Sequence, residues 1–462
     1  MEDNKIEKID YVDRHDSKGI KFGLDNIYEL LESFGNPHKE LKAIHIAGTN
    51  GKGSVGAYLL YILSSAGYKV GRLSSPVVFE ENEFAQIMYY KDDYNKNNIN
   101  TNKYCEKTNI DNINQNNKSK NVKDDIDKCI LENISFDYLQ DKTNYLTQIK
   151  LQGKPSGFEV QVAISLLYFK ENKCDIVIIE TGMGGKLDAT NVFDKTLCDV
   201  ITPISMDHMN MLGNTLQEIA MNKYGIITNN GNVVTTIDNY NIYKDGKPLI
   251  QEVCNEKNAN LYIVDKIFDL NNNKVEFNID NNIFEYKNKQ YMIRQNGKYQ
   301  IENAILAIEV INVLRDMGHN INEEKVKEGL LNMHLKGRFD VISRQPYIIA
   351  DGAHNVAGMN LLLESLDIYF KDRKVIFVTN IFRDKEYKKM FDMMKNKSKL
   401  IIGFETENPR SLKCDEMGSI YKTSSLEEAI RIAKGKCKDN DIIVCAGSLS
   451  FMKRLYSYFE IK

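Results

Sequence analysis

Short apolar runs alternate with longer amphipathic segments from Lys42 onward, and this alternation strongly restricts the possible folds. The run Ala43–Ala47 has the length and composition of a buried strand. The segment Ser54–Ala66 that follows is typical of a helix, and Gly67 is a suitable residue to end it. Alternating strands and helices favour an α/β protein with a parallel sheet.

The same pattern continues through the chain. Further strands are predicted at Asp175–Glu180, Asp199–Ile204 and Asn232–Ile237. Thr215 and Glu218 form a capping box, which predicts a helix that runs to about Gly225. The alternation restarts at Tyr347 and contains strand-like runs at 347–351, 375–380, 400–405 and 441–447. This second stretch predicts a smaller, doubly wound unit.

These patterns predict two domains, and a length of 462 residues suggests two or three. We expect a first domain over residues 1–335, a linker over 336–340 and a C-terminal domain over 341–462. Residues 91–124 are roughly one-third Asn, interleaved with Lys and Asp. Such a composition buries too little apolar surface to offset the entropy of ordering, so we expect a solvated insertion there.

Composition narrows the class of protein. Lys and Arg total 61 against 64 Asp and Glu, and this balance indicates neither a nucleic-acid nor a membrane-surface partner. No apolar run reaches the ~18 residues that a membrane span needs. The eight cysteines are scattered without a CxxC pair, and the N-terminus is charged throughout. We expect a cytoplasmic monomer that acts on small molecules.

The glycine-rich segment Gly48–Ser54 lies between a predicted strand and a predicted helix. Backbone N–H groups and the helix dipole at such a turn can bind phosphate, with Lys52 reaching the phosphate oxygens. The strict P-loop pattern fails, because Ile46 stands where its first glycine belongs. A purely structural turn is the alternative. We favour phosphate binding, and so predict a P-loop-type, mostly parallel sheet domain followed by a smaller Rossmann-like α/β domain.

Three more polar groups follow predicted strands. Glu180 opens a loop with three glycines, and a carboxylate at this sheet edge suits Mg²⁺, which binds few protein oxygens together with phosphate and water. His208 follows the next strand, although a lone histidine is more often a hydrogen-bonded structural residue. The turn Asp351–Asn355 contains an acceptor, an imidazole and an amide at the start of the second unit.

Seven blocks in this order resemble the folylpolyglutamate synthase/dihydrofolate synthase family of Mur-type ligases, which join an amino acid to a carboxylate using ATP. They are AGTNGKGS, GRLSSP, SGFE, ETGMGGKLDATN, MDHMNMLGNT…NKYGII, GRFD and DGAHN. The resemblance extends from about Tyr11 to Tyr456, apart from the Asn-rich insertion. It implies an ATP-dependent ligase that adds L-glutamate to a folate carboxylate through an acyl phosphate. The alternative acceptor is dihydropteroate.

The resemblance also implies roles for individual residues. ATP is expected to contact Asn50, Gly51, Lys52, Gly53, Ser54, Asn303, Arg338 and Asp351. The catalytic residues are expected to be Lys52, Lys223 and His354. Magnesium is expected at Ser75, Glu180 and His208, with a carbamylated Lys223 supporting a second ion. The folate or dihydropteroate pocket is expected at Ser156, Gly157, Phe158, Leu187, Asp188 and Ala189.

The chain differs from the family pattern at four positions, which we expect on the substrate side of the site. Val77 replaces a histidine, Phe84 and Lys186 each replace an arginine, and Tyr299 replaces another histidine. Lys186 keeps the charge but loses the bidentate fork of arginine.

Two other classes of protein remain as alternatives to a ligase. A nucleotide-dependent switch would not need the second domain, and a dinucleotide oxidoreductase is disfavoured because no GxGxxG follows the first strand.

Overall fold

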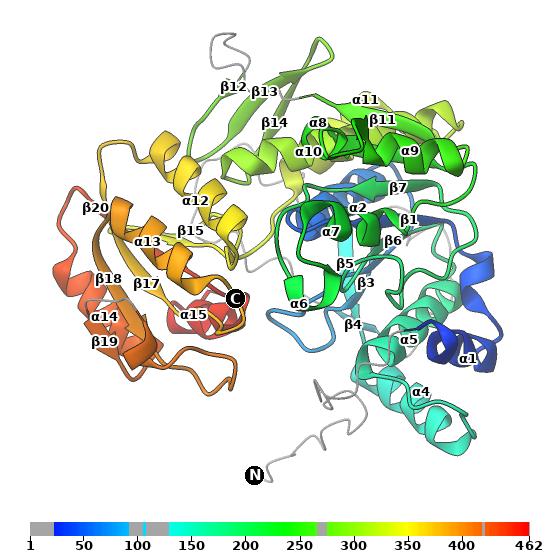
Figure 1. Ribbon diagram of the computed structural model, residues 1–462, viewed down its shortest axis with the longest axis horizontal. Coiled ribbons are helices and arrows are strands. Elements are labelled where there is room, and N and C mark those ends of the chain that lie inside the picture. The colour runs from blue at the N-terminus through cyan, green and yellow to red at the C-terminus, as the bar shows by residue number, and fades with distance from the viewer. Residues whose placement is uncertain (1–22, 92–104, 108–128, 266–274, 418–420, 462) are drawn as a thin grey trace.

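The computed structural model describes residues 23–91, 105–107, 129–265, 275–417 and 421–461. These residues form two α/β units, which lie side by side (Figure 1). The first unit contains a nine-stranded sheet, and the second contains a six-stranded sheet. Most of the predicted Asn-rich insertion, 91–124, lies outside the described residues. The expected α/β class is confirmed.

The large sheet has the strand order β11-β8-β7-β1-β6-β2-β3-β5-β4. Its strands are β1 (Ala43–Ala47), β2 (Val70–Leu73), β3 (Ala85–Tyr90), β4 (Cys105–Lys107), β5 (Cys129–Ile134), β6 (Ile176–Glu180), β7 (Cys198–Ile201), β8 (Asn232–Thr236) and β11 (Asn260–Val264). The strands from β11 to β2 pair in parallel, while β3, β5 and β4 add an antiparallel edge. The predicted parallel sheet is therefore present, together with an antiparallel extension.

Helices cover both faces of this sheet, which explains why its central strands are buried throughout and mostly apolar. One face packs on α2 (Lys52–Ser65), α10 (Lys298–Asp316) and α11 (Glu323–Asn332). The other packs on α1 (Asp25–Ser33), α4 (Phe136–Gln148), α5 (Gly157–Glu171), α7 (Leu216–Tyr224) and α9 (Leu249–Glu256). The short helices α6 (Met209–Leu212) and α8 (Ile237–Tyr240) lie in the loops after β7 and β8.

Two small antiparallel sheets complete the first unit. They are formed by β9 (Tyr243–Lys244) with β10 (Lys247–Pro248), and by β12 (Val275–Glu276), β13 (Asn282–Tyr286) and β14 (Lys289–Ile293). The three-stranded sheet lies near the second unit, where the Phe277 and Tyr369 rings meet edge to face with their centroids 5.7 Å apart.

The second unit has the strand order β15-β16-β20-β17-β18-β19. Its strands are β15 (Asp340–Arg344), β16 (Tyr347–Ala350), β17 (Lys374–Thr379), β18 (Ser398–Phe404), β19 (Tyr421–Thr423) and β20 (Asp441–Ala446). Its helices are α12 (Val356–Tyr369), α13 (Tyr387–Lys397), α14 (Leu426–Lys436) and α15 (Met452–Tyr458). Every neighbouring pair is parallel except β15 and β16.

One predicted strand is wrong at its end. The run Asp199–Ile204 was expected to be a strand throughout, but β7 ends at Ile201. Pro203 has no N–H for the ladder, and its carbonyl instead accepts hydrogen bonds from the Thr49 and Asn50 amides. His208 therefore lies in a loop, seven residues after the end of β7, rather than directly after a strand.

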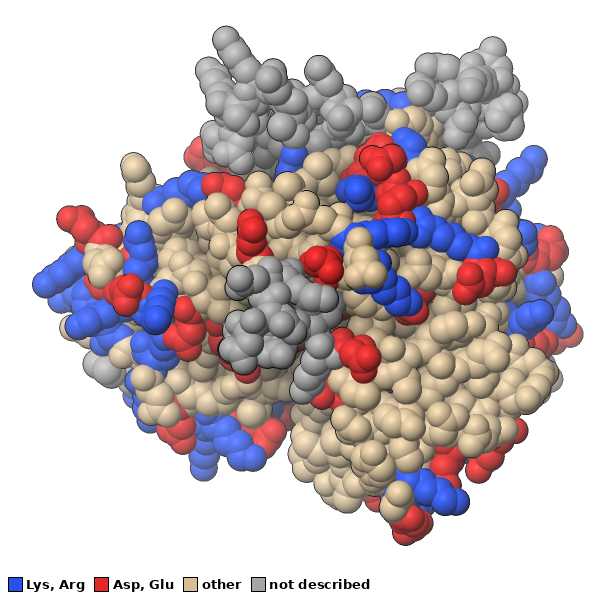
Figure 2. All heavy atoms as spheres, turned by 90° about the horizontal axis from the view of Figure 1, so that it is seen from above, with Lys and Arg blue, Asp and Glu red and all other residues tan. Residues whose placement is uncertain are grey.

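Lysine and arginine side chains intermingle with aspartate and glutamate on the face seen from above (Figure 2). Among the described helices, none combines the length and apolar character needed to cross a membrane.

Candidate active site

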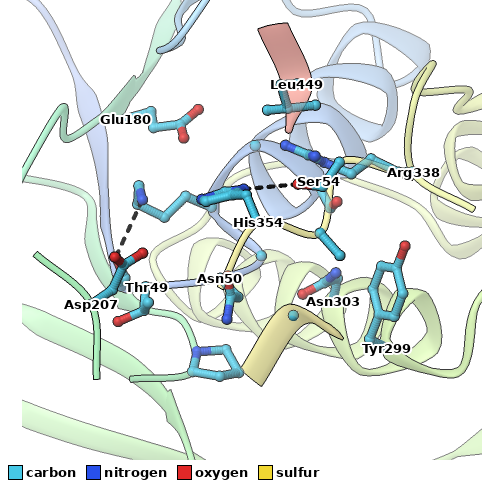
Figure 3. Close-up of a pocket in the computed structure, with 18 of the residues that line it drawn as sticks. Thr49, Asn50, Ser54, Glu180, Asp207, Tyr299, Asn303, Arg338, His354 and Leu449 are labelled. Atoms are coloured by element: carbon cyan, nitrogen blue, oxygen red, sulfur yellow. Dashed lines mark hydrogen bonds between the residues drawn. The ribbon is translucent and has the colours of Figure 1, made fainter. Parts of the chain in front are cut away.

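A pocket lies where the two units meet, and both contribute to its wall (Figure 3). Every residue predicted to contact ATP, to hold magnesium or to act in catalysis lines it. These residues are Asn50, Gly51, Lys52, Gly53, Ser54, Ser75, Glu180, His208, Lys223, Asn303, Arg338, Asp351 and His354. Residues more than 300 positions apart in the chain thus share one pocket.

The glycine-rich loop takes a shape that only glycine allows. Gly48 and Gly51 have φ angles of 150° and 93°. A Cβ added to Gly48 would lie 1.9 Å from Oγ1 of Thr202, and one added to Gly51 would lie 2.5 Å from Oδ1 of Asn303. The loop leads directly into α2, whose N-terminus carries free N–H groups and a partial positive charge. Such a turn suits phosphate.

Glu180 ends β6, is buried and lines the pocket. Burial raises the pKa of its carboxyl group, while the nearby cations Lys52, Arg72 and Arg338 act in the opposite direction. The carboxylate also accepts a hydrogen bond from the backbone of Ser75. Glu180 therefore places an acidic group among cations beside the glycine-rich loop Gly48–Ser54, which we call the phosphate loop.

Lys223 is buried on α7, and its Nζ donates a hydrogen bond to the Gly48 carbonyl, 2.7 Å away. Burial and, next, the charge of Lys52 lower the pKa of its amine to about 7. A large fraction of this amine is consequently neutral near pH 7. A neutral amine is the form that reacts with carbon dioxide to give a carbamate.

Two histidines reach the pocket in their neutral form. Burial and the charge of Lys385 lower the pKa of both His208 and His354, that of His354 to about 4. Nδ1 of His354 donates to the Gly352 carbonyl, 2.8 Å away, so its Nε2 keeps a lone pair. His208 is the N-cap of the short helix α6 and has a φ angle of 51°.

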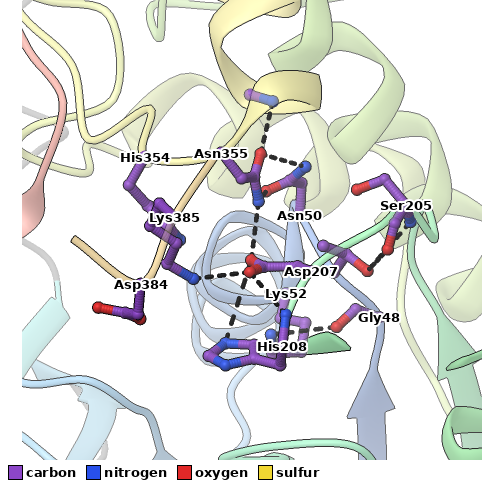
Figure 4. A network of polar contacts seen from close by, with 12 residues as sticks. Gly48, Asn50, Lys52, Ser205, Asp207, His208, His354, Asn355, Asp384 and Lys385 are labelled. Atoms are coloured by element: carbon purple, nitrogen blue, oxygen red, sulfur yellow. Dashed lines mark hydrogen bonds and ion pairs between the residues drawn. The ribbon is translucent and has the colours of Figure 1, made fainter. Parts of the chain in front are cut away.

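Direct contacts join the two units beside the phosphate loop (Figure 4). Nζ of Lys385 lies 2.6 Å from Oδ1 of Asp207, and Nδ2 of Asn355 donates to Oδ2 of Asp207 at 3.0 Å. Asn355 also donates to the Asn50 side chain at 3.1 Å. The sequence pointed to neither Asp207 nor Lys385. The only signal was that Asp207 precedes His208 in a polar block.

The residues predicted for the folate pocket lie elsewhere, because none of the six lines this pocket. The Ser156 side chain caps α5, and the Asp188 carboxylate binds the Met183 amide together with the amide and hydroxyl of Thr190. Leu187 is exposed and Ala189 is buried. The Phe158 ring lies 2.6 Å from where a Cβ of Gly182 would be, so Phe158 lies against the pocket-lining Gly182.

The proposed metal ligands fit magnesium by their chemistry. Within the described residues, no three His, Cys, Asp or Glu side chains gather as a ready-made metal site. The proposed ligands among the pocket-lining residues are the carboxylate of Glu180, the hydroxyl of Ser75 and the imidazole of His208. Magnesium is commonly held by one or two carboxylates plus phosphate oxygens and water, so this sparse set suits a metal that arrives with a nucleotide.

Comparisons with known proteins agree with this geometry. The Mur ligase middle domain matches residues 139–311, and the Mur ligase glutamate ligase domain matches residues 337–449. The dihydrofolate synthase/folylpolyglutamate synthase of Bacillus subtilis is 29% identical over 453 residues, covering 94% of each chain. The dihydrofolate synthetase of Saccharomyces cerevisiae is 31% identical over 379 residues, covering 79% of this chain and 77% of that protein.

A solved structure has the same fold. The folylpolyglutamate synthase of Mycobacterium tuberculosis, solved in complex with ADP, aligns with a TM-score of 0.75 at 22% identity and covers 94% of both chains. Sequence and fold therefore agree over nearly the whole length. The chain belongs to the folylpolyglutamate synthase/dihydrofolate synthase family, within the Mur ligase superfamily.

Proposed function

We propose that this protein is an ATP-dependent carboxylate–amine ligase that adds L-glutamate to the carboxylate of a folate, as a folylpolyglutamate synthase does. One observation carries the proposal: a single pocket contains Lys52 of the phosphate loop and Arg338 and His354 from the other side of the cleft. Ligation needs nucleotide, acceptor and amine to meet in a closed site, and residues from two units can assemble such a site.

ATP would lie between the two units. Its phosphates would contact the backbone of Asn50, Gly51 and Gly53, the hydroxyl of Ser54 and the ammonium of Lys52. Arg338, Asp351 and Asn303 would complete the nucleotide site. The guanidinium of Arg338 lies against Gly352, where an added Cβ would be 2.2 Å from its Nη1. We assign residues 1–335 to the phosphate loop and acceptor, 336–340 to the linker that carries Arg338, and 341–462 to the part that completes the nucleotide site and closes it.

Magnesium would be held by Ser75, Glu180 and His208. When bound, it would neutralise charge on the phosphate oxygens. A second ion is expected where Lys223 becomes carbamylated, because carbamylation turns its amine into a carboxylate-like group. The pKa of the Lys223 amine, which burial and the charge of Lys52 lower to about 7, supports this assignment.

The chemistry follows from the poor reactivity of a carboxylate toward amines. Attack of the carboxylate on the γ-phosphorus of ATP gives an acyl phosphate and ADP. The glutamate amine then attacks the acyl carbon, and the tetrahedral intermediate expels phosphate to leave the amide. Lys52 and Arg338 supply positive charge for the transferring phosphoryl group. His354 lies in the same pocket with a free Nε2, which suits contact with that group.

Two acceptor substrates are candidates for this one reaction. The B. subtilis relative carries both synthase names and the yeast relative is a dihydrofolate synthetase, so tetrahydrofolate and dihydropteroate are both candidates. Phe158 and the loop from Leu187 to Ala189 would contact the pterin from behind Gly182. We further propose that the protein is a cytoplasmic monomer. Light scattering would measure its mass in solution and so test whether it is monomeric.

A substrate panel tests the proposal. Purified protein with ATP and magnesium should release ADP only when L-glutamate and either tetrahydrofolate or dihydropteroate are both present. Mass spectrometry should find the acceptor heavier by one glutamyl residue. ADP release without an acceptor would instead support a nucleotide-dependent switch and would refute ligation.

A further inference from the structure

Tyr299 lies in the first turn of α10, and its side chain lines the pocket (Figure 3). Its hydroxyl donates a hydrogen bond to Oδ2 of Asp351, with the two oxygens 2.5 Å apart. Asp351 directly follows β16 of the second unit. The bond therefore links α10 of the first unit to the second unit within the wall of the nucleotide pocket.

Among the described residues, three donors hold the Asp351 carboxylate. Oδ1 accepts the Ala353 amide at 2.8 Å, and Oδ2 accepts the Phe339 amide at 2.8 Å in addition to the Tyr299 hydroxyl. Each carboxylate oxygen accepts about two hydrogen bonds, so Oδ2 is fully used and Oδ1 keeps one place for a ligand. Tyr299 is the only one of the three donors that comes from the first unit. Its loss would leave the carboxylate tied to the second unit and the linker alone.

The same face of α10 also touches the phosphate loop. Asn303 is four residues after Tyr299, which puts both side chains on one face of the helix. Oδ1 of Asn303 lies against Gly51, 2.5 Å from where a Cβ would be. A single turn of α10, about 6 Å long, thus separates the residue that packs on the phosphate loop from the residue that holds Asp351.

We propose that Tyr299 is a positioning residue of the nucleotide site: its hydroxyl orients the Asp351 carboxylate and fixes its distance from the phosphate loop. The inference rests on the proposed nucleotide-binding function. A nucleotide whose phosphates bind the loop must reach Asp351 across that fixed distance. The tyrosine stands where the family pattern has a histidine, so this contact is a property of this chain's own sequence.

Calorimetric titration of ADP into the full-length protein tests the proposal with two matched variants. Tyr299→Phe removes only the hydroxyl that binds Asp351. Tyr369→Phe removes a hydroxyl from the same interface, where Tyr369 donates to Asn282 and accepts from the Gly297 amide, without touching Asp351. Thermal unfolding of both variants measures the purely structural loss.

We expect Tyr299→Phe to weaken ADP binding about tenfold, because a hydrogen bond to a charged group is lost. Tyr369→Phe should bind ADP as the wild type does, while both variants unfold at a lower temperature. Wild-type affinity in Tyr299→Phe, or equal weakening in both variants, would overturn the positioning role alone. Failure of the wild type to bind ADP would overturn the nucleotide site and this inference with it.

Discussion

Nζ of Lys385 lies 2.6 Å from Oδ1 of Asp207, and this ion pair joins the two units at the edge of the pocket. Both side chains are almost fully enclosed, with 7% and 8% of their surfaces exposed. Burial raises the pKa of Asp207, but the charge and hydrogen bond of Lys385, together with His208 and the hydrogen bond from Asn355, outweigh it, so the net pKa is below its usual range. The carboxylate is thus charged at neutral pH and depends on its partner.

Lys385→Met should strongly destabilise the protein. The change leaves a buried carboxylate without its cation, which typically costs about 3–5 kcal/mol. Chemical denaturation checks this value. Adding Asp207→Asn to the same chain should recover much of the loss, because no charge is then stranded. If the double variant lost as much free energy of unfolding as the two single variants together, the ion pair would have no such role.

Lys52→Ala should abolish ligation and leave the fold intact. Its ammonium is the loop's own cation, and it donates to the Gly48 carbonyl at 3.2 Å. We expect turnover to fall by orders of magnitude at saturating ATP, with an unchanged circular dichroism spectrum. The exposed Lys371→Ala is the control and should behave as the wild type. Near-normal turnover in Lys52→Ala would refute the phosphate-loop assignment.

Glu180→Gln should raise the magnesium concentration needed for half-maximal activity and reduce turnover by orders of magnitude. The amide keeps the shape of the carboxylate but removes the charge that a hard cation prefers. His208→Ala should have a smaller effect, because a neutral imidazole contributes less to such an ion. Magnesium titrations of both variants check the order. A larger effect for His208→Ala would reverse the proposed ranking of the ligands.

Carbamylation of Lys223 should increase as the pH rises through about 7. Its amine has a pKa lowered to about 7, so the protein carries the unreactive ammonium below that pH and the reactive amine above it. NMR of protein kept in ¹³C-bicarbonate should show a carbamate resonance with that midpoint, and Lys223→Met should lack it. A midpoint near the ordinary value for lysine would contradict the effect of burial.

The sequence predicted those parts of the site that lie within single continuous segments of the chain. The strand–loop–helix around Lys52, Glu180 at the end of β6 and the turn from Asp351 to Asn355 are all continuous segments with clear patterns. Their convergence follows from parallel pairing, since the carboxyl ends of such strands share one edge. The match to a known family then supplied Ser75, Lys223 and Arg338, whose local patterns are unremarkable.

Contacts between residues far apart in the chain could not be predicted from the sequence. The pairing of Asp207 with Lys385 depends on how the two units lie together, and no local pattern in the sequence specifies that arrangement. The early end of β7 depends on Pro203 turning its carbonyl to the phosphate loop. The antiparallel strands β3 and β5 mix polar and apolar residues, and α10 is buried on most of its surface, so neither gave a clear pattern.

The origin of the oxygen in the released phosphate tests the central claim most directly. The acceptor is labelled with ¹⁸O in its reacting carboxylate and incubated with ATP, magnesium and L-glutamate, and the released phosphate is analysed by mass spectrometry. An acyl-phosphate ligase transfers one ¹⁸O atom to phosphate for each amide formed, and we expect this result. Unlabelled phosphate alongside ADP would mean that water attacks ATP, which would contradict the proposed reaction.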